Sequence, residues 1–169
     1  MFSSTLRTAG LLAILAFIAV PMRSAAELKA MSPMQACGFM NDHGLPTRAW
    51  RDSLGINEFA CSSSYRELGS GLLSNNLAYY VEGDKLSVKS LKLVLNVNNR
   101  EQANSGLQIL VSAAEALSQR VAGAKLPQSL SRALLDAKKT STRIGNVVVE
   151  VRRDDWPTGK GFEVHVAFR

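Results

Sequence analysis

The sequence predicts an α+β fold, a two-layer domain in which a long helix packs on one face of a mainly antiparallel sheet. Two pairs of segments with alternating apolar residues flank one long segment whose apolar residues recur every three or four positions. The connection within each pair is short, and short connections join antiparallel strands. We therefore expect four main strands and the element order αα-β-ββ-αα-ββ, with the first two helices as an N-terminal cap.

The first 26 residues have the pattern of an export signal. Arg7 supplies a positive charge, residues 11–20 are all apolar, and Ser24-Ala25-Ala26 places small side chains where a signal peptidase cleaves. A helix of about ten to twelve residues spans about 15–18 Å, which is short of the roughly 30 Å hydrocarbon core, so a retained anchor is less favoured. We expect cleavage after Ala26 and a mature chain, residues 27–169, that forms one domain without a membrane span in the bacterial periplasm or outside the cell.

The chain has two cysteines, Cys37 and Cys61. Thiols of an exported protein usually pair, and closing a loop of about 25 residues stabilises a fold by roughly 3 kcal/mol. A redox-active pair would need the Cys-x-x-Cys spacing, and a metal site would need two further ligands, for which only His43 and His165 are available. We therefore expect a structural disulfide, with no metal and no cofactor.

The N-terminal part of the mature chain predicts two helices followed by a short strand. Ser32 and Gln35 form a capping box for a helix that runs to about residue 43, and Gly44 can end it. Pro46 begins the second expected helix, over 46–54. Residues 59–61 then form a short strand, and most of the polar segment 62–75 forms a loop.

The centre of the chain predicts a hairpin and the long helix. Strands 77–81 and 86–97 are joined by a turn at Gly83-Asp84. Apolar residues of the second strand move from even to odd positions, which requires an inserted residue, so we expect a β-bulge near Lys89-Ser90. Asn99 and Gln102 form a second capping box for a helix over about 100–122. Its apolar stripe consists of Ala103, Leu107, Leu110, Val111, Ala114, Leu117 and Val121.

The C-terminal part predicts a helix that starts at Pro127 and a second hairpin. Strands 147–151 and 162–168 alternate apolar and polar residues, and the segment 154–161 between them is rich in turn formers. The acidic residues at 154 and 155 are typical of such a turn, and their spacing matches no calcium loop.

No motif of a known catalytic class is present. The serine run 62–64 lies outside any nucleophile elbow, and His43 at a helix C-terminus is favourably placed against the helix dipole. We therefore expect a protein without catalytic activity. The alternative is a small periplasmic hydrolase in which the 62–71 loop supplies the nucleophile and His43 acts as the base.

The aromatic residues are the candidates for a binding surface. Because Tyr79 and Tyr80 are adjacent on a strand, one ring must face outward, and we expect that ring to be Tyr80. Trp156 lies in the last turn, close in sequence to Arg152, Arg153 and Lys160. An aromatic ring beside cations suits an anionic glycan or a partner protein, although a tryptophan folded back over the sheet edge is the alternative. We expect a binding protein of the cell envelope whose partner is an envelope protein or an anionic glycan, and not a nucleic acid.

Overall fold

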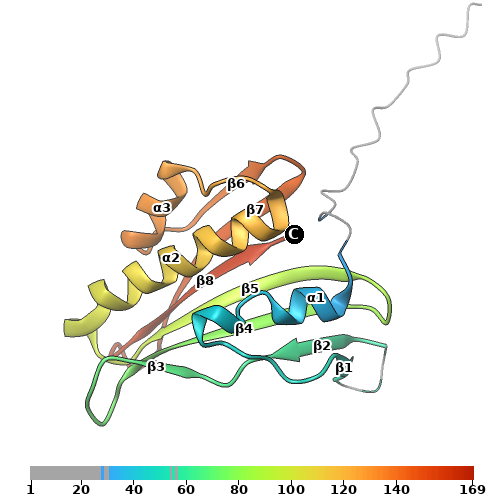
Figure 1. Ribbon diagram of the computed structural model, residues 1–169. Helices are drawn as coiled ribbons and strands as arrows, with labels where there is room; N and C mark the ends of the chain where they lie inside the picture. Colours follow the sequence, from blue (N-terminus) through green and yellow to red (C-terminus); the bar gives the residue numbers. More distant parts are fainter. Residues whose placement is uncertain (1–27, 29–30, 54, 56) are drawn as a thin grey trace, which may run out of the picture.

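The computed structural model describes residues 28, 31–53, 55 and 57–169 (Figure 1), so the expected signal peptide at 1–26 lies outside the described residues. Three α-helices and eight strands make up the described part of the chain. The helices are α1 (Pro33–Gly38), α2 (Ala103–Ala122) and α3 (Gln128–Leu135). The strands are β1 (Arg51–Asp52), β2 (Phe59–Ser62), β3 (Arg66–Leu68), β4 (Asn75–Gly83), β5 (Val88–Val97), β6 (Thr140–Ile144), β7 (Val147–Asp155) and β8 (Phe162–Phe168).

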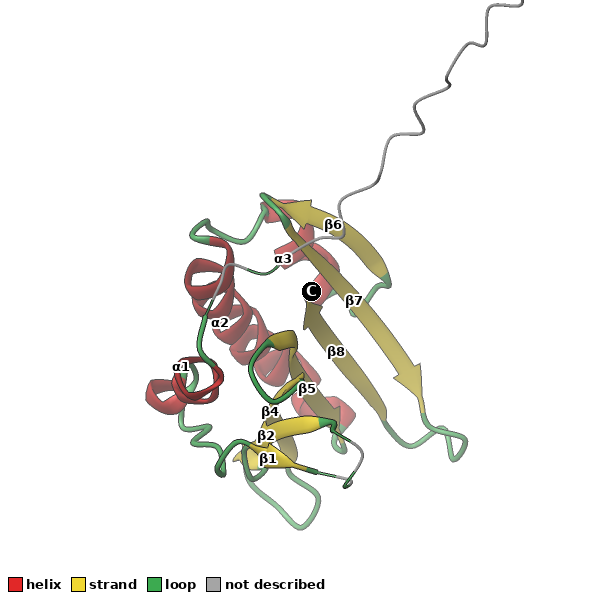
Figure 2. Cartoon of the chain, turned by 90° about the vertical axis from the view of Figure 1, so that its right-hand side faces the viewer, coloured by secondary structure: helices red, strands yellow, loops and turns green. Residues whose placement is uncertain are grey.

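All eight strands belong to one antiparallel sheet. Its order is β1-β2-β4-β5-β8-β7-β6, and β3 pairs with the half of β4 that β2 leaves free. Figure 2 shows the sheet bending around α2, with the helices on one side. The α+β class is therefore confirmed; the four expected long strands are present, but the sheet has eight strands instead of four.

The additional strands are short segments whose pairing is not evident from their own residues. The segment expected to form the second helix instead makes a β-bridge from Thr47 to Ser63 and then forms β1, which pairs with β2. The Arg48 N–H donates to the Ser62 carbonyl at 3.0 Å, so the backbone of this segment bonds along a sheet edge instead of within a helix. Leu54, expected in that helix, lies outside the described residues. β3 and β6 are mostly polar, and each buries one residue fully, Leu68 and Ile144.

The β-bulge is confirmed. Glu82 is opposite Ser90 and Gly83 is opposite Val88, so Lys89 is the extra residue of β5. The inserted residue moves the apolar side chains of β5 onto the helix-covered face from Leu91 onward.

The capping box at Ser32 and Gln35 is confirmed, and α1 begins at Pro33. Ser32 Oγ accepts from the Gln35 N–H at 3.3 Å, and Gln35 Oε1 accepts from the Ser32 N–H at 3.2 Å. α1 ends at Gly38, earlier than expected, and a short 3₁₀ turn (Asn41–His43) leads to Gly44 in the left-handed conformation. The expected capping box at Asn99 and Gln102 is not formed: the Asn99 N–H donates to Asn75 Oδ1 at 2.8 Å, and a second 3₁₀ turn, Arg100–Gln102, precedes α2.

The core lies between the helices and one face of the sheet. α2 packs on β4, β5 and β8, and α3 packs on α2, β6 and β7. Within the expected stripe of α2, five side chains are buried against this face: Leu107, Leu110, Ala114, Leu117 and Val121. The side chains that meet them come from alternate positions of the four long strands, as in a sheet with one buried face.

The disulfide between Cys37 and Cys61 is confirmed, with Cα atoms 6.1 Å apart. It fastens α1 to β2. The Tyr79 hydroxyl adds a second attachment by donating to the Ala36 carbonyl at 2.9 Å, and burial raises the pKa of this tyrosine well above its usual value. Within the described residues, no helix combines the length and the apolar composition that a bilayer crossing requires.

Candidate functional site

One face of the sheet carries no helix within the described part of the chain (Figure 2). We call it the open face. Cross-strand pairing arranges its central side chains in three rows across β4, β5, β8 and β7. The rows are Tyr80, Lys92, Ala167 and Glu150; Ala78, Val94, His165 and Arg152; and Asn76, Asn96, Glu163 and Asp154. Nine of these twelve residues are polar or charged, and the three apolar ones, Ala78, Val94 and Ala167, are buried.

A shallow pocket of about 110 Å³ lies in the first two rows and is lined by Lys92, Glu150, Arg152, His165, Ala167 and Arg169. Ala167 is 5% exposed and has the shortest side chain of the lining, so it forms the floor beneath the longer side chains. Three lining residues are cations and one is an acid. Each cation has an acidic partner: Arg169 Nη1 lies 2.6 Å from Glu150 Oε2, Arg152 Nη2 lies 2.7 Å from Asp154 Oδ2, and Lys92 Nζ lies 3.5 Å from Glu82 Oε1.

Two tyrosines extend this surface toward β2. The Lys92 ammonium lies 5.2 Å from the centroid of the Tyr80 ring, and the Tyr80 hydroxyl lies 3.5 Å from the Tyr65 hydroxyl. Partial burial and the hydrogen bond with Tyr65 raise the pKa of Tyr80 well above its usual value. The Tyr80 O–H donates to the Tyr65 hydroxyl, and the exposed Tyr65 can in turn donate a hydrogen bond to a ligand.

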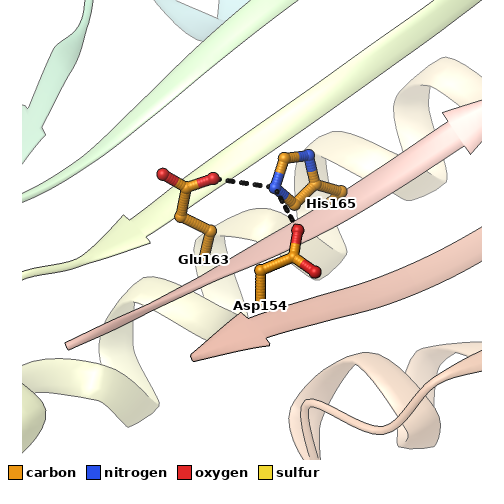
Figure 3. Close-up of side chains that lie close together, drawn as sticks. All are labelled: Asp154, Glu163 and His165. Atoms are coloured by element: carbon orange, nitrogen blue, oxygen red, sulfur yellow. Dashed lines mark hydrogen bonds and ion pairs between the residues drawn. The ribbon is translucent and has the colours of Figure 1, made fainter. Parts of the chain in front are cut away.

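At the β7–β8 side of the open face, three metal-ligating side chains converge (Figure 3). His165 Nε2 lies 2.8 Å from Glu163 Oε2 and 3.3 Å from Asp154 Oδ2. Asp154 Oδ2 also forms an ion pair with Arg152 Nη2, at a distance of 2.7 Å. The His165 side chain is 14% exposed, so its ring is largely withdrawn from solvent while both carboxylates remain accessible.

Two of the residues expected to bind a ligand lie on the open face. Arg152 lines the pocket, and Tyr80 lies beside Lys92 at its edge. Arg153 is on the opposite face of β7, where its guanidinium stacks 4.0 Å from the Phe162 ring centroid. Arg153 also bonds to Asp155 at 2.6 Å and thereby lowers the pKa of that carboxyl.

The other two expected binding residues lie in the turn between β7 and β8. Trp156 is half-buried and packs on Gly161, where an added Cβ would come within 2.5 Å of the indole ring. The tryptophan is therefore folded back toward the sheet. Lys160 lines a different hollow of about 360 Å³, which the exposed Leu72 and Leu73 border. The sequence neighbours Arg152, Arg153, Trp156 and Lys160 are thus distributed over separate surfaces.

Two residues of the alternative hydrolase site, Ser63 and His43, make hydrogen bonds to other parts of the described chain. Ser63 Oγ accepts a hydrogen bond from the Tyr79 N–H at 2.9 Å, and the His43 carbonyl accepts one from Arg66 Nη1 at 2.7 Å. Within the described part of the 62–71 loop, no serine is hydrogen-bonded to His43. Ser63 and the residues of β3 pair with neighbouring segments of the sheet, and Ser70 and Gly71 border the 360 Å³ hollow that Lys160 lines.

Sequence reasoning did not find four residues of the open face: Lys92, Glu163, His165 and Arg169. The short turn between β7 and β8 could have predicted two of these positions, because a tight hairpin places Asp154 opposite Glu163 and Arg152 opposite His165. The pairing of β5 with β8, which brings in Lys92, joins segments about 70 residues apart and has no local signal. No protein-family model, curated protein sequence or solved structure matches this chain.

Proposed function

We propose that this chain is an exported, non-catalytic binding protein of the bacterial cell envelope that holds an anionic glycan on its open face. The observation that carries the proposal is the pocket over Ala167, with Lys92, Arg152 and Arg169 around it. A carboxylate or phosphate group placed there accepts charge-assisted hydrogen bonds, which are stronger than neutral ones.

The location is supported by two features. The disulfide between Cys37 and Cys61 is consistent with an oxidising compartment, since such bonds are rare in the cytosol. Residues 1–26 have the charge, apolar run and small residues of an export signal. Together they favour the periplasm.

A sugar ligand is supported by the aromatic rings beside the cations. Tyr80 presents an aromatic ring and a protonated phenol, and Tyr65 adds a second hydroxyl. Rings pack on the apolar faces of sugars while hydroxyl groups bond to their edges. Catalysis is less well supported, because the described residues pair no serine of the 62–71 loop with His43.

The test is a calorimetric titration of the purified chain with protein-free acidic cell-wall glycan fragments. Arg152→Gln should weaken binding by about 1.5–3 kcal/mol, the range for hydrogen bonds to charged groups. Arg153→Gln is the matched control, because this neighbouring arginine faces the opposite side of the same strand. Binding that neither variant changes would place the ligand elsewhere. Binding of envelope proteins alone, with no glycan bound, would contradict the ligand class.

A further inference from the structure

We propose that Asp154, Glu163 and His165 form a binding site for a divalent transition-metal ion of the Zn²⁺ type. Asp154 and Glu163 are Cα partners across β7 and β8, and His165 lies two residues along β8 on the same face. Among the described residues they are the one group of three or more metal-ligating side chains whose donor atoms converge, with all donors within 4.8 Å of one another (Figure 3).

The distances fit a shared ion. Zinc bonds to nitrogen and oxygen are about 2.0–2.2 Å long, so two donors on one ion lie about 2.9–3.5 Å apart at octahedral or tetrahedral angles. His165 Nε2 is 2.8 Å from Glu163 Oε2 and 3.3 Å from Asp154 Oδ2. Both distances from the imidazole nitrogen therefore match one shared ion, the two carboxylate oxygens lie within 4.8 Å of each other, and the backbones of the two strands that carry them are already paired.

The donor set selects the kind of ion. One imidazole nitrogen with two carboxylate oxygens suits Zn²⁺, Co²⁺ and related ions, whereas Mg²⁺ and Ca²⁺ favour sites made of oxygen alone. Three protein ligands leave coordination positions free for water or for an anionic ligand. The exposed fractions of the Asp154 and Glu163 side chains, 44% and 34%, leave a path for the ion to enter from solvent.

Arg152 competes with the ion for one of these ligands. Its Nη2 lies 2.7 Å from Asp154 Oδ2, the same oxygen that faces His165. Without a metal, an Nε2–H of His165 and the Arg152 guanidinium together compensate the two carboxylates. A bound metal ion takes the place of that Nε2 proton, and its positive charge is repelled by the Arg152 guanidinium. Removing this arginine should therefore favour the metal.

The experiment is a calorimetric titration of the chelator-treated, purified chain with ZnSO₄. We expect one ion per chain. His165→Ala, Glu163→Gln and Asp154→Asn should each weaken Zn²⁺ binding at least about tenfold, since even the partners of metal ligands are worth 10–100-fold. His43→Ala, the control at the other histidine, should leave the affinity unchanged. Arg152→Gln should tighten Zn²⁺ binding by about tenfold, because a nearby guanidinium repels a divalent ion.

Two further measurements keep the test decisive. Thermal unfolding checks that each variant is folded, and the near-isosteric Glu163→Gln and Asp154→Asn test the site even where His165→Ala fails to fold. Co²⁺ should give visible absorption bands of a nitrogen- and oxygen-ligated ion that are absent in Glu163→Gln. The site is refuted if the wild-type chain binds no Zn²⁺, if any folded ligand variant keeps the wild-type affinity, or if Mg²⁺ binds as tightly as Zn²⁺. Because Zn²⁺ alone is the probe, none of these outcomes depends on glycan binding.

Discussion

Leu110 lies at the centre of the contact between α2 and the sheet, with no exposed surface. Truncating it to alanine removes buried methyl groups and leaves a cavity, so Leu110→Ala should lower the free energy of unfolding by about 2–5 kcal/mol. Gln108→Ala, on the exposed side of the same helix, should change it by less than about 0.5 kcal/mol. Urea unfolding of both variants measures the difference, and equal losses would mean that the buried side of α2 is misassigned.

Asp84 gives a prediction about pH. Ser87 Oγ donates to Asp84 Oδ2 at 2.7 Å, and this bond, with those from the Leu86 and Ser87 N–H groups, lowers the pKa of Asp84 from 3.8 to about 2. A lowered folded-state pKa stabilises the fold above pH 4, and this contribution is lost as the pH falls toward 2. Ser87→Ala should shift the Asp84 titration, followed by NMR of the carboxyl carbon, upward toward 3.8. An unchanged titration midpoint would show that the Ser87 hydroxyl does not stabilise the ionised Asp84 carboxylate.

At this scale the sequence was informative where a residue acts on its near neighbours. The bonds between Ser32 and Gln35 and the bulge at Lys89 depend on residues a few positions apart, and both were predicted. The role of His165 was not predicted, because one of its two carboxylate partners, Asp154, comes from the other strand of the hairpin.

At the scale of the elements, the disulfide joins the first helix to an edge strand. It closes a loop across a sequence separation of 24 residues, and it constrains the unfolded chain more than the folded one. Cys37→Ser should therefore lower the free energy of unfolding by about 2–4 kcal/mol. Denaturant unfolding with and without reductant tests this: the difference from wild type should disappear once the wild-type bond is reduced. A difference that persists in reductant would assign the loss to side-chain packing at position 37.

Elements whose apolar residues repeat with a regular period, or that begin with a capping signal, were predicted from the sequence. Short strands that form only because they pair with a neighbouring strand were not predicted. α2 repeats apolar residues over five turns, and β4, β5, β7 and β8 alternate them over long runs. β1 and β3 have two and three residues, too few for an alternation to be distinguished from chance. They become strands because β2 and β4 offer unpaired edges.

A second prediction at this scale concerns the turn between β7 and β8. Because the Trp156 ring packs on Gly161, Gly161→Ala should displace the ring and lower the melting temperature by several degrees, as expected for overpacking that costs about 1–3 kcal/mol. Gly159→Ala is the comparison, because the space around Gly159 is open and its φ is positive, so this substitution strains the backbone without touching the ring. The sharper comparison is the intrinsic tryptophan fluorescence, which should shift in Gly161→Ala alone. An unshifted spectrum would mean that the ring does not rest on this glycine.

At the scale of the whole molecule, the open face exists because the three helices of the described residues pack on the other side of one continuous sheet. The sequence indicated two hairpins and a helix layer, but it did not indicate that β5 pairs with β8. That pairing places Lys92 of the first hairpin beside Ala167 of the second and completes the pocket. Since it joins distant segments, local pattern could not reveal it.

The most direct measurement of the open face as a binding surface is an NMR titration of the isotopically labelled chain with the acidic cell-wall glycan fragments. The amide signals of Lys92, Arg152 and Ala167 should shift progressively, while those of Leu110 and Leu117 in α2 should stay in place. Shifts confined to the helices, or to the turn at Trp156 and Lys160, would contradict the open face as the site of binding.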